Sequence, residues 1–215
     1  TVPAPRARTA SGRRPRIGVL KAATDYIQPE VAKNFEASLA VLAGFADLTR
    51  DVALVDLPFG LVAGTIVDAE GGSAFLELIE SGRLRELAAK SDRYGGYSSV
   101  MTPAVDYLQA MRLREKMRAP MAALLERYDA LVAPARATVA LPVDVDFDKA
   151  YPELAKGRPE NFVSPIGALI SVGNLVGYPA LCLPNGFGAS GLPTGIQLLG
   201  GPFREAELAA IGSEI

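Results

Sequence analysis

Residues 164–203 read SPIGALISVGNLVGYPALCLPNGFGASGLPTGIQLLGGPF, and this stretch decides the fold. It contains two short apolar runs, at 179–184 and 196–199, separated by a cluster of glycine, proline and asparagine residues. Apolar runs of four to eight residues bounded by such residues are typical of buried strands. The stretch therefore predicts two buried strands joined by a glycine-rich hairpin.

A helix is expected immediately before the first of these strands. Residues 166–176 are apolar and small, and they end at Gly177, with Pro179 two positions further on. Glycine just past the last helical turn, followed by proline, is a C-terminal stop signal. Taken alone, the segment is a helix, a tight turn and a hairpin that belong to the core.

The upstream chain alternates between strand and helix patterns. Apolar runs and helical spacing predict strands at 16–20, 52–55 and 129–134, and helices at 28–45, 62–79 and 103–128. Gly71 and Gly72 predict a break or a close packing contact in the second helix, and Pro120 should kink or split the third. This order of elements argues for a mixed α/β fold with a sheet flanked by helices.

Composition limits the partners that the chain is expected to have. With 215 residues, 49% of them hydrophobic, the chain is long enough for one sizeable core, forming one domain or part of a larger one. The net charge of −2 provides no positive electrostatic field that would attract nucleic acid. No apolar run approaches the ~20 residues of a membrane-spanning helix. We therefore expect neither a nucleic-acid partner nor a membrane.

The single cysteine, Cys182, cannot form an internal disulfide, which suits a reducing compartment and predicts a cytoplasmic location. Because it lies in a predicted buried strand, it is expected to be an inert core thiol. Histidine is absent, which excludes Ser-His and Cys-His pairs and the usual zinc sites. No metal or cofactor is expected, and hydrolytic chemistry would need lysine, a carboxylate or groups outside the chain.

Three segments near the C-terminus resemble the signature of the amidase signature family. They are Asn174-Leu175-Val176-Gly177-Tyr178-Pro179-Ala180-Leu181, then Leu183-Pro184-Asn185-Gly186-Phe187, then Gly191-Leu192-Pro193-Thr194-Gly195-Ile196-Gln197-Leu198-Leu199-Gly200 with Pro202-Phe203. Weaker matches follow the family's order upstream, at Pro15-Arg16-Ile17-Gly18-Val19, Asp68-Ala69-Glu70-Gly71, Asp106-Tyr107-Leu108 with Ala110 and Arg114, and Tyr128-Asp129-Ala130-Leu131-Val132-Ala133-Pro134. The resemblance covers about residues 15–211.

The resemblance implies a large mixed sheet wrapped by helices and amide hydrolysis by a serine nucleophile, a second serine on a cis peptide and a lysine base. That mechanism needs no histidine. The family's lysine and its Gly-Gly-Ser-Ser-Gly-Gly segment lie upstream of every match, and nothing in residues 1–16 resembles them. The near match Gly95-Gly96-Tyr97-Ser98-Ser99 lacks the trailing glycines, so it is expected to be a turn. No catalytic residue is therefore assigned within this chain.

Residues 1–15, rich in proline and arginine, are expected to form a flexible arm or linker. Residues 16–215 are expected to form the C-terminal part of an amidase-like α/β domain. Asn174 and Gln197 are the candidate substrate-binding residues. Asn174 ends a helix, where its amide can fix the turn, and Gln197 is polar within an apolar strand and needs a partner. Structural hydrogen bonding is the alternative for both.

Two functions follow. In the first, the chain is the C-terminal portion of a hydrolase acting on carboxamide C–N bonds, inactive alone and binding a small amide substrate when completed by an N-terminal half. In the second, it is a non-catalytic remnant that acts as a structural or partner-binding module. Near-continuous apolar strands are typical of strands buried on both faces, so we also expect self-association or a partner chain.

Overall fold

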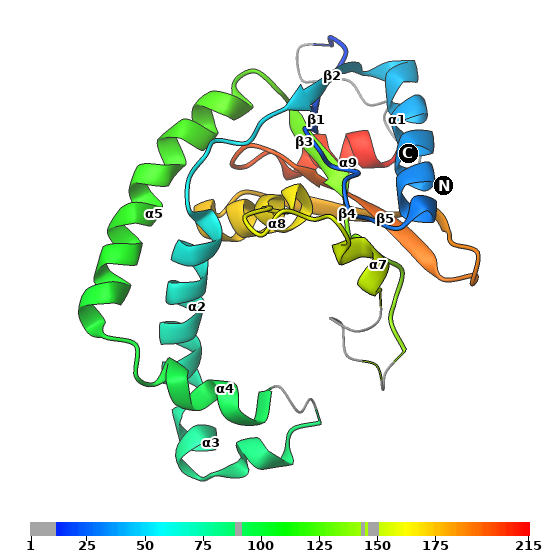
Figure 1. Cartoon of the computed structure of the whole chain (residues 1–215). Helices are drawn as coiled ribbons and strands as arrows, with labels where there is room; N and C mark the ends of the chain where they lie inside the picture. The colour runs from blue at the N-terminus through cyan, green and yellow to red at the C-terminus, as the bar shows by residue number, and fades with distance from the viewer. Residues whose placement is uncertain (1–11, 89–91, 143–144, 146–150) are drawn as a thin grey trace, which may run out of the picture.

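The computed structural model describes residues 12–88, 92–142, 145 and 151–215, and these form a mixed α/β structure (Figure 1). A five-stranded sheet has the order β2-β1-β3-β5-β4. The strands are β1 Arg16–Leu20, β2 Asp47–Val52, β3 Ala130–Pro134, β4 Ala180–Phe187 and β5 Pro193–Leu199. β1 runs parallel to β2 and β3, whereas β5 runs antiparallel to β3 and β4, so the sheet is mixed as the sequence predicts.

Helices cover both faces of the sheet. The elements are α1 Pro29–Phe45, α2 Phe59–Ala74, α3 Leu76–Glu80, η1 Arg83–Glu86, α4 Asp92–Ser99, α5 Ala104–Leu125, α7 Pro152–Ala155, α8 Pro165–Val176 and α9 Glu205–Gly212. Thr194 and Gln197 lie three positions apart on β5 and so point to opposite faces. Thr194 accepts a hydrogen bond from Asn34 of α1, and Gln197 donates to Ile166 of α8. α1 and α8 therefore cover opposite faces.

The predicted central strands are confirmed. Ile17, Leu131 and Leu198 are completely buried, and α1 adds Phe35 and Leu39 to the same core. Helix α8 spans 165–176 as expected and ends at Gly177, whose φ of 72° is the left-handed conformation that glycine adopts without strain. The C-terminal stretch thus folds as helix, tight turn and hairpin.

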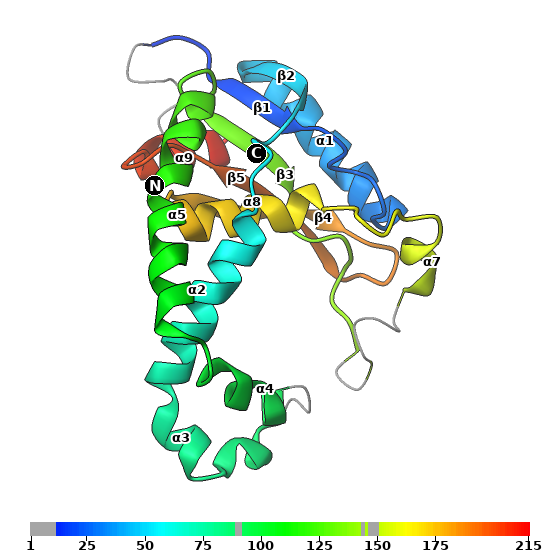
Figure 2. The same cartoon turned by 60° about the vertical axis from the view of Figure 1, so that its left-hand side comes forward.

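Helices α2 and α5 form an arm that projects away from the sheet and carries α3 and α4 at its tip (Figures 1 and 2). The close contact predicted for the glycine pair occurs at Gly72, where an added Cβ would lie 2.8 Å from the backbone carbon of Ser99. Pro120 does not split α5, which continues to Leu125. The buried side chains Met117, Met121 and Leu124 hold the helix on both sides of the proline.

Two secondary-structure predictions are wrong in the arm and beside it. Residues 95–99 belong to helix α4 and are not a turn, because Gly96 packs closely against Ile79 and Leu84 at the tip of the arm. The second strand is β2 at 47–52, displaced from the predicted 52–55. β2 is a largely exposed edge strand, so it lacks the apolar run on which the prediction depended.

The prediction of two buried strands in the hairpin is right for β5 and wrong for β4. β4 is the other edge of the sheet, and exposed residues alternate with half-buried ones along much of it. Cys182 pairs with Gln197 across the ladder, on the face where α8 contacts β3 and β5. Cys182 is exposed at this edge, which corrects its expected position as an inert core thiol.

We expect the Cys182 thiol of the 215-residue chain to react fully with a chromogenic disulfide reagent without denaturant, because edge position leaves it open to solvent. The matched control is Val132→Cys in a Cys182→Ser background, since Val132 is completely buried and should react only on unfolding. Protection that increases with protein concentration would indicate self-association through β4. Protection at every concentration would contradict the exposed edge.

Candidate functional site

A cavity of about 530 Å³ lies where the parallel strands β1 and β2 end and where α2 and α8 begin. Its lining includes Leu20 and Val52, the last residues of the two strands, together with residues 53–61 and the start of α8. Ligands of α/β sheets commonly bind outside the carboxyl ends of strands. The place and size of this cavity make it the candidate substrate site.

The lining of this cavity is largely apolar. Lys21 and Asp56 are its charged residues, and both are exposed. Ser164 and Ser171 contribute hydroxyl groups, and Ser164 makes no side-chain capping bond to α8. Within the described residues, no hydrogen bond joins Lys21 to either serine. The cavity therefore offers a shaped wall without an assembled pair of nucleophile and base.

Gln197 is 3% exposed, so its predicted burial and hydrogen bonding are confirmed. Its Nε2 donates to the carbonyl oxygen of Pro134 at 2.9 Å and to that of Ile166 at 3.3 Å. The first bond reaches the end of β3 and the second reaches the first turn of α8. Gln197 thus holds the start of α8 against the sheet, behind the cavity wall. Contact with substrate stays a prediction.

Asn174 is exposed on α8 and does not fix the turn as expected. The turn is closed by the backbone, because the carbonyl of Gly173 accepts from the N–H groups of Gly177 and Tyr178. Asn174 instead lines a second cavity, of about 200 Å³, with Glu70 of α2 and Arg114 of α5. Its role as a substrate ligand stays a prediction.

This second cavity brings together residues from three of the sequence segments that matched the family. Arg114 donates through Nε to the carbonyl oxygen of Leu175 at 2.7 Å, in the last turn of α8. Tyr107 donates its hydroxyl to Glu70 at 3.2 Å. The first contact joins the arm to α8 and the second joins α5 to α2 within the arm, and no spacing in the sequence indicated either of them.

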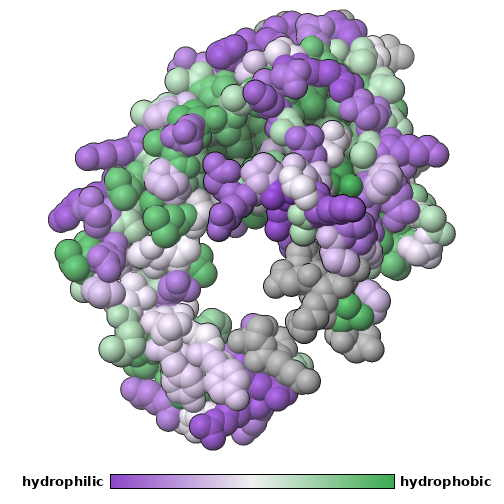
Figure 3. Space-filling model, in the orientation of Figure 1, coloured by the Kyte–Doolittle hydropathy of each residue, from purple (hydrophilic) through white to green (hydrophobic). Residues whose placement is uncertain are grey.

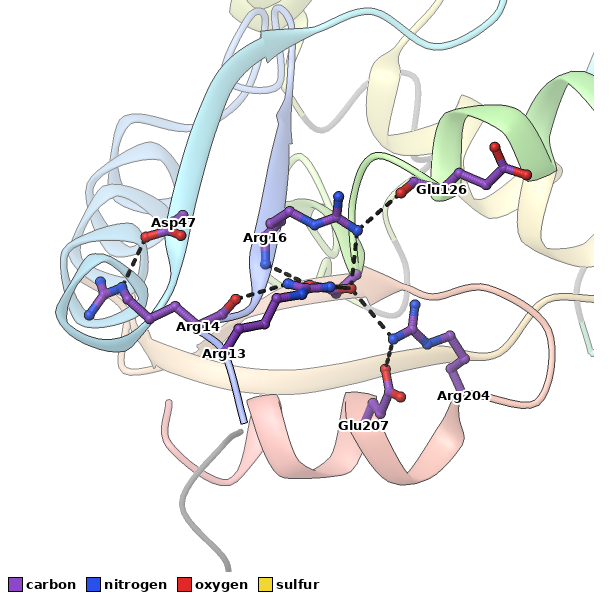
Figure 4. Close-up of polar contacts among 8 residues, drawn as sticks. Arg13, Arg14, Arg16, Asp47, Glu126, Arg204 and Glu207 are labelled. Atoms are coloured by element: carbon purple, nitrogen blue, oxygen red, sulfur yellow. Dashed lines mark hydrogen bonds and ion pairs between the residues drawn. The ribbon is translucent and has the colours of Figure 1, made fainter. Parts of the chain in front are cut away.

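A buried carboxylate that no sequence pattern indicated, that of Asp129, lies at the other end of the sheet. Arg13 donates two hydrogen bonds to Asp129, at 2.7 and 2.8 Å, and the backbone N–H of Arg16 donates a third at 2.8 Å. Arg204 approaches the same carboxylate to 3.4 Å and also pairs with Glu207 (Figure 4). Asp129 thereby joins the segment before β1, the start of β3 and the start of α9.

Burial raises the pKa of Asp129, but the hydrogen bonds from Arg13 and Arg16 and the charges of both arginines outweigh it. The net effect lowers the pKa of Asp129 below its usual value. Arg14 also binds, through Nε, to Asp47 at 2.9 Å. Near the end of the expected arm, Arg13 and Arg14 are therefore held by side-chain contacts, whereas residues 1–11 lie outside the described part of the chain.

Comparison with known proteins identifies the family to which this chain belongs. A family model described as Amidase matches residues 3–209. The chain therefore belongs to the amidase signature family.

Two relatives are subunits of glutamyl-tRNA(Gln) amidotransferases. The protein from Thermosynechococcus vestitus is 27% identical over 217 residues, covering 90% of this chain and 43% of its own length. The protein from Moorella thermoacetica is 39% identical over 102 residues, covering 47% of this chain and 19% of its own. The chain thus spans less than half the length of these relatives.

Solved structures share the fold at low identity. An amidase crystal structure superposes with a TM-score of 0.74 at 23% identity, covering 98% of this chain and 46% of the other. Allophanate hydrolase from Kluyveromyces lactis superposes with a TM-score of 0.71 at 20% identity, covering 98% of this chain and 33% of the other.

None of the described helices is long and apolar enough to cross a bilayer. In the described part of the chain, no cluster of three potential metal-ligating side chains occurs.

We expect Asp129→Asn to lower the free energy of unfolding by about 1–3 kcal/mol at neutral pH, because it removes the buried charged acceptor of Arg13 and of the Arg16 backbone N–H. The contribution of a carboxylate with a depressed pKa is complete above its unfolded pKa of about 4 and is lost as the pH falls through the folded pKa. Denaturant unfolding from pH 7 to pH 3 should therefore show the difference shrinking at the acid end.

The control for Asp129→Asn is Glu36→Gln, which breaks the exposed ion pair with Arg50 and should cost less than about 1 kcal/mol. Equal losses for the two variants, or a difference for Asp129→Asn that does not depend on pH, would contradict the assignment of Asp129 as the buried charge.

We expect Gln197→Met to cost about 1–3 kcal/mol, because the methionine fills similar space but leaves the carbonyl of Pro134 without its donor. Cys182→Ser is the matched control, since it changes the exposed residue directly across the ladder and should stay within about 0.5 kcal/mol. Urea unfolding of the three proteins measures both. Equal stability of Gln197→Met and the unchanged chain would rule out a structural bridge.

Proposed function

We propose that the chain is the C-terminal portion of an amide hydrolase that acts on carboxamide C–N bonds of small molecules. In this proposal, residues 1–15 are a linker whose end is bound to the domain through Arg13 and Arg14, and residues 16–215 supply scaffold and one wall of the substrate site. The catalytic serines and the lysine base lie outside the chain. The observation that carries the proposal is the cavity of about 530 Å³ at the strand ends of an amidase-family fold.

The geometry supports a division of labour within such an enzyme. A largely apolar wall excludes water, and exclusion of water strengthens the electrostatic stabilisation of a developing oxyanion. Helix α8 forms part of this wall and is fixed at both ends, by Gln197 at its first turn and by Arg114 at its last. The wall is therefore positioned before a substrate arrives, as efficient binding requires.

The open edge at β4 supports completion by further protein. No described strand pairs with its outer side, and Cys182 on it is exposed. Unpaired strand edges pair readily with another chain. We propose that a complementary N-terminal half, in the same protein or in a partner, adds to the sheet here, and that without it the chain self-associates. The single cysteine favours a cytoplasmic setting.

The second candidate is a non-catalytic module. One structural neighbour, with a TM-score of 0.73 at 24% identity over 93% of this chain and 42% of the other, belongs to a complex described as vestigial and linked to the origin of an s-triazine catabolic enzyme. In this second candidate, the chain would bind a partner and would not itself turn over a substrate. The absence of a hydrogen-bonded pair of nucleophile and base among the described residues of the cavity is compatible with this candidate.

We expect the isolated 215-residue chain to release no ammonia above background from acetamide, benzamide or glutamine, whereas the chain completed by an N-terminal half, in one polypeptide or in a complex with a partner, hydrolyses at least one of them. The physical reason is that the nucleophile and base are supplied from outside this chain. A coupled ammonia assay at equal molar concentrations measures both. Turnover by the isolated chain would contradict the division of labour, and inactivity of both proteins would favour the non-catalytic module.

A further inference from the structure

Helix α2 is apolar on two opposite faces. Its buried residues include Phe59, Val62 and Ile66, on the side where α2 meets α5 and α8. Its other side carries Val67 and, directly after the helix, Phe75, which are 66% and 61% exposed. A helix that is hydrophobic all round is normally a buried helix. The second apolar face is therefore built to be covered.

The exposed face follows one line along the helix. Gly60, Gly64, Val67, Gly71 and Phe75 are spaced by three or four residues, so they lie on the same side of α2. We call these five residues the α2 stripe, and none of them is charged. Added Cβ atoms on Gly64 and Gly71 would meet no heavy atom within 4 Å. The stripe is therefore open on its outer side, and its glycines allow the backbone of another element to approach closely.

The α2 stripe lies next to two open features of the molecule. The arm borders a hollow, and α2 is the helix on the hollow side of the arm, with α5 outside it (Figures 1 and 3). At the other end of the stripe, Gly60 and its neighbour Leu61 line the 530 Å³ cavity. A protein segment seated on the stripe would thus also reach the mouth of that cavity.

Two observations favour a complementary half over a second copy as the occupant of the stripe. The chain spans less than half the length of its relatives, so the larger share of such a protein can fill the hollow. Pairing of two stripes about a two-fold axis through their centre would set the exposed Asp68 of each copy beside the other. Like charges placed side by side are destabilising, and Asp68 forms no ion pair among the described residues.

We propose that the α2 stripe is the docking surface for a helix of the complementary N-terminal half. The inference rests on the proposed function, because that function supplies the partner. The docked helix presents large apolar side chains to the glycines and to Val67, and a basic side chain to Asp68. Docking buries the second apolar face of α2 and closes the open side of the 530 Å³ cavity. The catalytic groups of the complementary half then reach the cavity from a fixed position.

Thiol labelling tests whether the stripe is covered. A cysteine is placed by Val67→Cys in a Cys182→Ser background, and its reaction with a chromogenic disulfide reagent is followed in two forms of the protein. The isolated 215-residue chain should react freely. Completion by an N-terminal half, in one polypeptide or in a complex, should slow the reaction at least about tenfold, because the thiol becomes buried. Val41→Cys, at an exposed position on α1, is the matched control and should react equally in both forms.

Thermal unfolding provides a second test, in which docking reverses the sign of the effect. In the isolated chain, Gly64→Gln should raise the Tm by about 1–4 °C, because glutamine is a better helix former and meets open space. In the completed protein the added side chain lies between two packed helices, so the Tm should fall by about 4 °C or more. Gly44→Gln on α1, whose added Cβ also meets no atom within 4 Å, should shift the Tm of both forms equally.

The outcomes separate this inference from the proposed function. A completed protein that hydrolyses amides while the Val67→Cys thiol stays reactive would overturn the docking surface and leave the proposed function intact. Protection in the isolated chain that increases with its concentration would assign the stripe to a second copy and would also overturn the inference. A completed protein that protects the thiol but hydrolyses no amide would overturn the proposed function and support the docking surface.

Discussion

The complete burial of strand β3 is the constraint on which the rest of this structure depends. All five of its residues are buried, and it lies between a parallel neighbour, β1, and an antiparallel neighbour, β5. A strand enclosed in this way must satisfy its backbone through both ladders and its side chains through helices on both faces. The layers formed by α1 and α8 follow from that requirement (Figure 1).

Two buried polar side chains fix the ends of this strand. Asp129 precedes β3 and binds Arg13 and the backbone of Arg16, whereas Gln197 donates to the carbonyl of Pro134, the last residue of β3. Buried polar groups are costly unless they are satisfied, so each of them specifies one arrangement of the elements that it joins. Asp129 fixes the segment that enters β1, and Gln197 fixes helix α8 beside the cavity at the ends of β1 and β2.

The surface of the molecule has two concave regions, which differ in what surrounds them. The apolar cavity is bounded by the ends of β1 and β2 and by the starts of two helices, whereas the arm borders an open hollow (Figure 3). Both the hollow and the outer side of β4 lack a neighbouring element among the described residues. The chain spans less than half the length of its relatives. The proposed function assigns to this chain the part of an amidase that shapes the site, and to other protein the part that reacts.

The sequence by itself determined the central strands, helices α1 and α8 and the turn at Gly177, because each is encoded by local apolar spacing or by a glycine and proline signal. It also determined the family, through the residues around 174–203. Tertiary structure alone decided that β4 and Cys182 are exposed, that residues 95–99 are helical, and that Asp129 meets Arg13 and Arg204. These features depend on which elements lie next to each other in space. An apolar run has the same pattern whether a helix covers one of its faces or both, and a carboxylate shows no partner until residues far away in the sequence, such as Arg13 and Arg204 for Asp129, fold against it.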